Sequence, residues 1–225
     1  MIVIVDYGMG NLRSIQNMLK YIGIDSRISS DIEAIREATK LILPGVGAFD
    51  NAIRNIEKLH LRDILLTKAL NEKTPILGIC LGLQLFAKCS EEGSLPGLGL
   101  IDAETVRFKF AGGNGELKIP HMGWNEIAIQ NNSRLFDGLS DAARFYFVHS
   151  YHLKCTDERD IEATTFHGYN FVSAIERENI YGVQFHPEKS HRFGMKVLKN
   201  FAEISEYVEN ADAPDGTGYA LPAGA

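Results

Sequence analysis

The chain has 225 residues, enough for one large domain or two small ones, and either can bury a sizeable core. A formal net charge of −6 and the lack of a long basic run argue against nucleic-acid binding. No apolar stretch approaches the roughly 18 residues of a membrane span, and the start lacks the basic segment of a secretory signal. The 3 scattered cysteines are too few for a disulfide framework, so we expect a reducing, cytoplasmic compartment. Cys89 and Cys155 are expected to be buried and to have no role in the chemistry.

The first half of the chain alternates short aliphatic runs with segments of helical periodicity. The runs rich in Val, Ile and Leu are predicted strands, at residues 2–5, 24–28, 41–43 and 75–79. The segments with apolar residues at helical spacing are predicted helices, at residues 11–22, 31–38 and 81–88. Asn11 and Asp31 stand where their side chains can cap the first two helices. This alternation favours βαβ units and a parallel sheet.

Beyond Gly93 the sequence changes to strands and turns. The predicted strands are residues 100–110, 125–130, 145–149, 161–166, 171–176 and 180–185. Several gaps between them are too short for helical crossovers, so we expect antiparallel pairing in this half. A last helix is predicted from about Arg192 to Val208, again from apolar residues at helical spacing.

These elements predict one domain over residues 1–208, because no internal repeat or long linker divides that stretch. The expected fold class is α/β, with a three-layer architecture in which helices cover a doubly wound, mixed sheet. The segment 209–225 is small and polar, and we expect it to be a disordered tail.

The segment 74–84 predicts a sharp strand-to-helix turn with Cys80 at its apex. Gly78 and Gly82 lie two residues before and two after it, and their missing side chains relieve the crowding around such an apex residue. A thiol at this position also lies at the N-terminus of a helix, which favours the thiolate. The pattern is typical of a nucleophile; the alternative is a small core residue that happens to lie between glycines.

A proton shuttle for Cys80 is predicted at His186, which ends the strand predicted at 180–185. Its imidazole would reach the same edge of the sheet as the thiol. Glu188 lies two residues further on, a spacing that in extended chain places both side chains on one side. Its carboxylate can then orient the ring and stabilise its protonated form. Without Cys80, this His-x-Glu pattern would be more typical of an ordinary turn.

Acyl transfer through a cysteine also needs hydrogen-bond donors for the developing oxyanion. The segment that follows the third predicted strand contains Gly45, Val46 and Gly47, whose backbone amides can face an oxygen. The amide of Leu81, beside the nucleophile, is a natural second donor. The alternative for the glycine segment is a simple turn.

Together these motifs resemble those of the triad-type, or class I, glutamine amidotransferases. The resemblance extends from Met1 to about Val208 and rests on Pro44-Gly-Val-Gly47, Gly78-Ile-Cys-Leu-Gly82-x-Gln84 and His186-Pro-Glu188, in that order. Further blocks are similar to the glutaminase subunits of imidazole glycerol phosphate synthases. These blocks are Asp6-Tyr-Gly-Met-Gly-Asn11-Leu-Arg-Ser14, Pro120-His-Met-Gly-Trp124-Asn125, Tyr146-Phe-Val-His149-Ser150-Tyr151 and Gly182-Val-Gln-Phe-His-Pro-Glu-Lys-Ser190.

The resemblance implies hydrolysis of glutamine to glutamate and ammonia. Cys80 would attack the side-chain amide, and His186, held by Glu188, would protonate the departing ammonia before water hydrolyses the thioester. The glycine segment at 45–47 would serve the oxyanion. The residues that match the glutamine pocket of the family are Gln84, His149, Ser150 and Tyr151. No cofactor is implied.

The resemblance also implies a partner, because ammonia released into water at neutral pH is protonated and is no longer a nucleophile. The implied partner is a HisF-like (β/α)8-barrel cyclase that forms a heterodimer with the chain and receives ammonia through a tunnel. The positions that match its interface are Asn11, Trp124 and Tyr146. Trp124 could instead be a core residue, but Gly123 and Asn125 around it indicate an exposed turn. The isolated chain is expected to have weak activity.

Other functions remain open at this stage. The segment His191-Arg-Phe-Gly-Met195 departs from histidine-pathway members and resembles relatives found with surface-polysaccharide genes, so amidation of an amino sugar is an alternative use of the ammonia. A peptidase-like or gamma-glutamyl hydrolase of similar fold is less compatible with the Trp124 turn and the His149-Ser-Tyr block. A catalytically silent regulatory module is less compatible with an intact nucleophile and shuttle.

Two further patterns could suggest a nucleotide cofactor or a metal site, but both are incomplete. Gly8-x-Gly10 lacks the third glycine of the dinucleotide motif, because Arg13 occupies that position. His149 and His152 have a spacing that is sometimes seen in metal sites, but no cluster of further ligands accompanies them.

Overall fold

A computed structural model describes residues 1–110, 117–130, 133–140 and 143–205. The strands are β1 (Ile2–Val5), β2 (Ser26–Ser29), β3 (Lys40–Gly45), β4 (Ile76–Cys80), β5 (Cys89–Ser90), β6 (Ala103–Arg107), β7 (His121–Glu126), β8 (Ala128–Ile129), β9 (Arg144–His149), β10 (Tyr151–Cys155), β11 (Ile161–Phe166), β12 (Asn170–Arg177) and β13 (Ile180–Val183). The helices are α1 (Leu12–Tyr21), α2 (Ile32–Arg36), α3 (Phe49–Lys58), α4 (Arg62–Leu66), α5 (Leu81–Gln84) and α6 (His191–Glu203). Short helical turns are η1 (Thr67–Asn71), η2 (Arg134–Phe136), η3 (Glu158–Asp160) and η4 (Pro187–Lys189).

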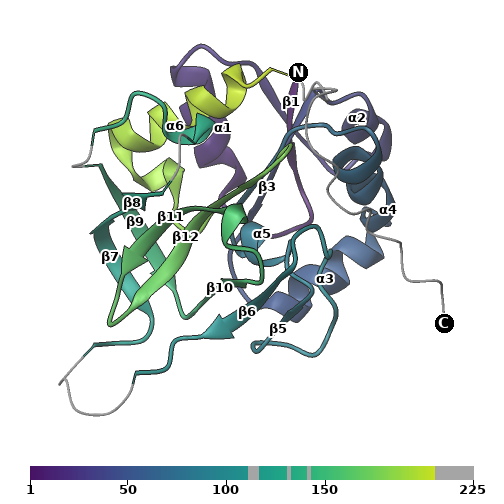
Figure 1. Cartoon of the computed structure of the whole chain (residues 1–225). Helices are drawn as coiled ribbons and strands as arrows, with labels where there is room; N and C mark the ends of the chain where they lie inside the picture. The colour runs from purple at the N-terminus through teal and green to yellow at the C-terminus, as the bar shows by residue number, and fades with distance from the viewer. Residues whose placement is uncertain (111–116, 131–132, 141–142, 206–225) are drawn as a thin grey trace, which may run out of the picture.

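The central sheet is mixed, as predicted, and has the strand order β2-β1-β3-β4-β13-β12-β10-β6-β5 (Figure 1). The strands from β2 to β13 in this order run parallel, whereas β12 pairs antiparallel with both β13 and β10. A separate small sheet pairs β7 with β9 antiparallel. The parallel part therefore places the carboxyl ends of β3 and β4 side by side.

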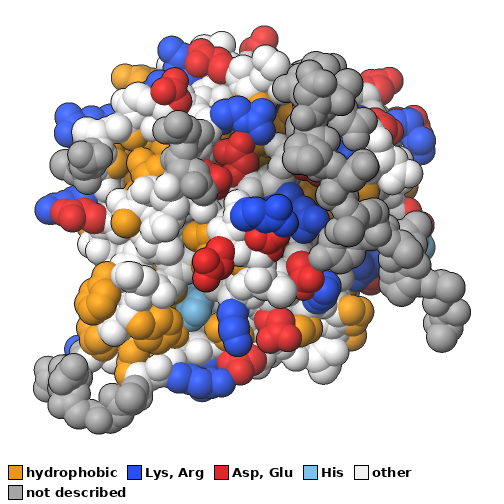
Figure 2. Space-filling view, viewed as in Figure 1, with side chains coloured by type: hydrophobic (Ala, Val, Ile, Leu, Met, Phe, Trp, Pro, Cys, Tyr) orange, Lys and Arg blue, Asp and Glu red, His pale blue; other side chains and the backbone are white. Residues whose placement is uncertain are grey.

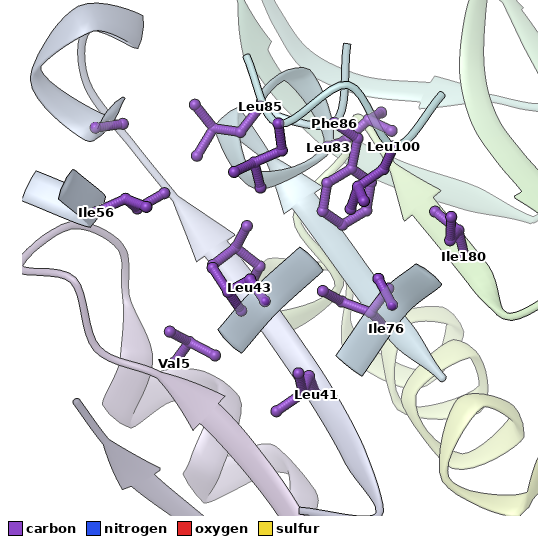
Figure 3. Packing of buried hydrophobic residues seen from close by; sticks show 14 of the residues in the cluster. Val5, Leu41, Leu43, Ile56, Ile76, Leu83, Leu85, Phe86, Leu100 and Ile180 are labelled. Carbon is purple, nitrogen blue, oxygen red and sulfur yellow. The ribbon is translucent and has the colours of Figure 1, made fainter. Parts of the chain in front are cut away.

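Alternation along the central strands divides the core into two layers. In β1, Ile2 and Ile4 belong to a cluster with buried residues of α1 and α6, whereas Val3 and Val5 belong to a cluster with those of α3 and α4. Figure 3 shows part of the second cluster, in which side chains of α5 and of the residues just after it lie over β3 and β4. Because helices cover both faces, the predicted three-layer fold is confirmed.

Helix α3 has no counterpart among the predictions, which assign no element to residues 46–74. The signal was nevertheless present, since Phe49, Ala52, Ile53 and Ile56 follow the spacing of one helix face, and all are buried. Among the later strands, the predicted range 161–166 is that of β11, whereas β10 was not predicted.

The two predicted helix caps have different outcomes. Asp31 accepts a hydrogen bond from the backbone amide of Glu33, which confirms it as the cap of α2. Asn11 occupies the corresponding position of α1, but its side chain makes no capping hydrogen bond, so that prediction is wrong.

The helix after Cys80 is shorter than predicted and ends at Gln84. The carbonyls of residues 85–88 accept hydrogen bonds from backbone amides of residues 97–101, and so they cannot continue the helix. Cys89 consequently lies in β5 and is exposed, and Cys155 is only half-buried. The expectation that both cysteines are buried was wrong, because it placed Cys89 late in a longer helix.

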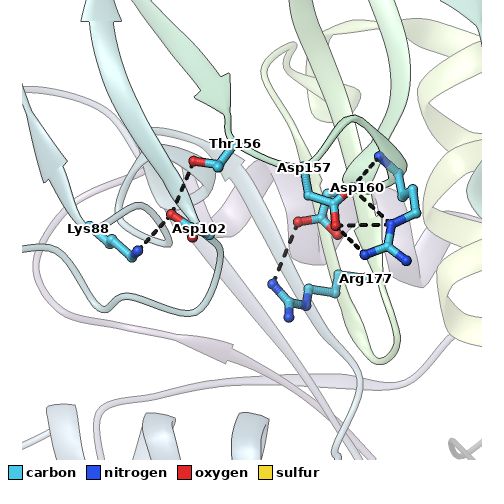
Figure 4. A network of polar contacts seen from close by, with 7 residues as sticks. Lys88, Asp102, Thr156, Asp157, Asp160 and Arg177 are labelled. Atoms are coloured by element: carbon cyan, nitrogen blue, oxygen red, sulfur yellow. Dashed lines mark hydrogen bonds and ion pairs between the residues drawn. The ribbon is translucent and has the colours of Figure 1, made fainter. Parts of the chain in front are cut away.

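Two groups of polar contacts lie near the ends of β10 and β12 (Figure 4). Asp102 accepts a hydrogen bond from Thr156 and pairs with Lys88 at 2.7 Å, and Asp160 pairs with Arg177 at 3.7 Å. The Lys88–Asp102 pair is partly exposed, and pairs of that kind contribute modestly to stability, whereas Asp160 is buried. Both groups lie away from the carboxyl ends of β3 and β4, where the candidate site is built.

Some predictions lie outside the described residues, namely the tail 209–225 and the last residue of the predicted final helix, Val208. Within the ranges that are described, no helix is long and apolar enough to cross a lipid bilayer.

Candidate active site

Strand β4 passes into α5 through a sharp turn at Cys80, which has the unusual backbone angles φ 55° and ψ −110°. The flanking glycines make this turn possible. A Cβ at Gly82 would collide with the carbonyl oxygen of Leu43 in β3, and one at Gly78 would lie 2.7 Å from the backbone of Leu83. The turn therefore requires the glycine spacing that the sequence shows.

His186 and Glu188 meet at the same edge of the sheet. The imidazole Nδ1 lies 2.9 Å from Glu188 Oε1, and both side chains are almost completely buried. The ring nitrogen Nε2 is also buried and makes no hydrogen bond to any residue that the structure describes. Glu188 reaches the ring from the helical turn η4 rather than from the extended chain that the spacing suggested, so that part of the interpretation is corrected.

Cys80 and Glu188 both affect the protonation of His186. Burial is the largest single influence on the imidazole and lowers its pKa, but the neighbouring Cys80 and the hydrogen bond to Glu188 together outweigh burial and raise the pKa of His186 to about 10. The arrangement favours a protonated imidazole next to the sulfur. The structure therefore brings together the three residues for which the sequence predicted the roles of nucleophile, shuttle and orienting carboxylate, from motifs far apart in the chain.

The predicted oxyanion segment lies beside the turn. Gly45 is the partner of Cys80 in the register of β3 and β4, and a Cβ on it would lie 2.9 Å from the Cβ of Leu81. Val46 is 44% exposed, and Gly47 has φ +111°, a conformation that favours glycine. Gly45 and Leu81 thus lie beside the turn at Cys80, and Val46 and Gly47 follow Gly45 at the same edge of the sheet.

Tyr7 is a residue of this region to which the sequence analysis gave no role. Its side chain is completely buried, and its hydroxyl donates a 2.6 Å hydrogen bond to the carbonyl of Pro44. Burial and, less strongly, the charge of Cys80 raise the pKa of Tyr7 far above its ordinary value, so the hydroxyl stays protonated. Tyr7 thereby fixes the peptide that precedes Gly45. A tyrosine two residues after a buried strand was the available signal.

Comparison with known proteins agrees with this geometry. Residues 3–204 match the family Glutamine amidotransferase class-I. The chain belongs to the class-I glutamine amidotransferases. The family resemblance in the sequence is confirmed, and so is the assignment of the chain as a glutamine amidotransferase subunit with glutaminase activity.

Several relatives of this amidotransferase are similar over almost their whole length. Imidazole glycerol phosphate synthase subunit HisH 2 of Methanococcus maripaludis is 55% identical over 89% of this chain and 98% of that protein. The subunit HisH 2 of Pseudomonas aeruginosa is 46% identical over 91% of this chain and 100% of that protein. The PurLQS structure from Thermotoga maritima shares the fold, with a TM-score of 0.67 at 17% identity over 89% of this chain and 96% of the other.

The residues expected in the glutamine pocket of the amidotransferase meet at the carbonyl of Tyr151. This oxygen accepts hydrogen bonds from Gln84 Nε2 at 2.9 Å and from His149 Nδ1 at 2.8 Å. Gln84 and His149 are buried, whereas Ser150 and Tyr151 are half-buried. Ser150 lies between the other two in the chain, and its carbonyl accepts a hydrogen bond from Phe108.

Two of the three expected interface residues of the amidotransferase are neighbours. Trp124 and Tyr146 pair across β7 and β9, and their ring centroids are 6.2 Å apart. Trp124 is 46% exposed, which excludes the core interpretation, and it lies in a strand rather than in the expected turn. His191 stacks parallel to Trp124 at 5.4 Å. Asn11 is exposed at the start of α1.

A chain of buried hydrogen bonds determines the protonation of two histidines. The Tyr151 carbonyl can only accept, so His149 donates to it through Nδ1 and accepts from His121 through Nε2, at 3.1 Å. His121 in turn accepts from the amide of Asn125 through Nε2. Both rings are therefore neutral. Within the described ranges, no group of three or more His, Cys, Asp or Glu side chains is arranged to hold a metal ion.

Acid is expected to destabilise the protein through these rings. Burial and, less strongly, His167 lower the pKa of His121 to about 4, and burial lowers the pKa of His149 well below 6.5. In the unfolded chain the two histidines take up protons near pH 6.5, whereas in the folded protein they stay neutral until the pH is much lower. The stability that the rings contribute is complete above pH 6.5 and is lost as the pH falls towards 4.

Urea unfolding between about pH 7 and about pH 4.5 should show a loss on the order of 2 kcal/mol from His121. His121→Gln should flatten this part of the pH dependence, whereas the exposed control His60→Gln should leave it unchanged. An unaltered slope in His121→Gln would show that the buried rings do not govern acid stability.

Proposed function

We propose that this amidotransferase hydrolyses glutamine at Cys80 and supplies the ammonia as the glutaminase subunit of an imidazole glycerol phosphate synthase in histidine biosynthesis. The observation that carries the proposal is one buried imidazole, His186, that lies 2.9 Å from Glu188 and whose pKa is raised by the neighbouring Cys80. HisH relatives that are 55% and 46% identical, and that are covered almost completely, support the choice of pathway.

The first half of the reaction forms a thioester. The Cys80 thiolate attacks the side-chain carbonyl carbon of glutamine, and the carbonyl oxygen becomes an oxyanion. Backbone amides of the 45–47 segment and of Leu81 donate hydrogen bonds to that oxygen. The protonated His186 then gives its proton to the amide nitrogen as the carbon–nitrogen bond breaks, so ammonia leaves and the glutamyl group stays on the sulfur.

The second half returns the site to its starting state. His186 is now neutral and takes a proton from water, which attacks the thioester carbonyl. The carbon–sulfur bond breaks, glutamate leaves and the sulfur departs as thiolate beside the protonated ring. Glu188 holds the same ring nitrogen throughout and stabilises its positive charge.

The partner in this proposal is a HisF-like (β/α)8-barrel cyclase, which forms a heterodimer with the chain. Figure 2 shows hydrophobic side chains gathered where β7, β11 and β12 reach the surface. Exposed apolar residues on these strands are Met122 at 62%, Trp124 at 46% and Phe166 at 66%. Large apolar side chains that are exposed on neighbouring strands are typical of a protein–protein contact.

Glutamate release from glutamine tests this function directly. We expect a slow rate for the chain alone and an increase of about tenfold or more when the barrel partner and its acceptor substrate are added, a change of the size typical of coupling between two sites. A slow rate without the partner is expected because ammonia made without an acceptor is protonated in water and lost. Equal rates with and without partner would contradict the proposed coupling.

An amino-sugar acceptor is the second candidate, and it would change the partner rather than the chemistry. The segment 191–195 that suggested it forms the first turn of α6, and its His191 stacks on Trp124 at the proposed interface. A change in this segment could therefore select a different barrel. Identification of the barrel protein that copurifies with the chain, followed by an assay of its product, separates the two acceptors.

A further inference from the structure

Gln184 is a buried polar residue beside the nucleophile to which the reaction above assigns no part. It follows β13, two residues before His186, and its side chain is completely buried. Its Nε2 lies 3.7 Å from Cys80 Sγ, and its Oε1 accepts a 3.1 Å hydrogen bond from Gln84 Nε2. The backbone amide of Gln184 donates to the carbonyl of Ser173 in β12, which fixes this segment to the sheet.

The direction of the Gln184 amide follows from its neighbours. The Tyr151 carbonyl can only accept, so the end of Gln84 that lies 2.9 Å from it must be the NH2 group. The second hydrogen of that group faces Gln184, which must present its oxygen there. The remaining end of the Gln184 amide, its NH2 group, therefore faces the sulfur of Cys80 as a donor.

We propose that Gln184 is a positioning residue that donates a hydrogen bond to the Cys80 sulfur and fixes the amide of Gln84. A donor at this distance stabilises the thiolate more than the thiol. Both hydrogens of Gln84 Nε2 are already used, so the group that Gln84 can offer to glutamine is its oxygen Oε1. This inference rests on the proposed role of Cys80 as the nucleophile.

The test is the pH dependence of Cys80 alkylation by iodoacetamide in the full chain, followed on its own peptide by mass spectrometry. In Gln184→Leu and in Gln184→Met, which keeps the length of the side chain, the midpoint should move to higher pH by about one unit, because a hydrogen bond to a charged group is lost. Glutamine turnover with the partner should fall about tenfold or more. Alkylation of the exposed Cys89 provides an internal control.

Asn179→Leu is a matched control for the loss of a buried amide. Asn179 donates to the carbonyls of Ala69 and Thr74 and lies at the amino end of β4, the end opposite Cys80, so its loss should lower stability without moving the Cys80 midpoint. An unmoved midpoint in folded Gln184→Met would overturn the inference and reduce Gln184 to a packing residue. Alkylation needs no turnover, so this failure is distinct from failure of the proposed function, which would appear as normal glutamine hydrolysis by Cys80→Ser.

Discussion

Replacing the proposed nucleophile, Cys80→Ser, should lower glutamine hydrolysis in the complex with the barrel partner by about a thousandfold. Serine fits the same turn, but its hydroxyl holds its proton much more tightly than a thiol does, and the protonated His186 cannot remove that proton. Glutamate release measures the loss. Synthesis by the partner from added ammonia should continue, because Cys80 has no part in the acceptor reaction.

Cys89→Ser is the matched control, since it makes the same change at an exposed cysteine in β5 and should leave glutamine hydrolysis unchanged. Full glutamine-dependent activity of Cys80→Ser with the partner bound would exclude the thioester route. A loss of ammonia-dependent synthesis would instead show that the substitution disrupts docking, and native mass spectrometry of the complex would then identify that defect.

The sequence predicted the turn at Cys80 because its requirements are local. Glycines two residues before and after one residue, with a strand on one side and a helix on the other, describe a single backbone shape. The structure gives the reason atom by atom, since side chains at Gly78 and Gly82 would meet α5 and β3. The parallel half of the sheet was predictable for the same reason: short aliphatic runs and helical periodicity are local signals.

Features that depend on tertiary packing were not predictable. Gln184 is one position in an apolar strand pattern, and only the approach of β4 to the segment after β13 places its amide beside the sulfur. The contact of Glu188 with His186 depends on the helical turn η4, whereas the prediction assumed an extended chain at this point. Cys89 is exposed because the helix ends before it. Backbone amides of residues 97–101 donate to the carbonyls of residues 85–88, which a longer helix would have used.

Gly82→Ala should be the most destabilising single-methyl change at the site. The added Cβ would collide with the Leu43 carbonyl oxygen, so β3 or the turn must move, and the loss of unfolding free energy is expected to be about 3 kcal/mol. Urea unfolding measures it. Because Cys80 already holds a strained conformation, any movement of the turn displaces the sulfur from His186, and glutamine hydrolysis should fall as well.

Gly23→Ala separates this collision from backbone strain. Gly23 has φ +79° with open space around its Cβ position, so alanine there carries only the cost of the left-handed conformation, about 1 kcal/mol. It lies far in sequence from the turn and should leave glutamine hydrolysis unchanged. Equal losses of stability in Gly82→Ala and Gly23→Ala would mean that β3 can shift to accommodate the extra methyl group at little cost. The close packing of β3 against the turn would then not be what holds Cys80 in place.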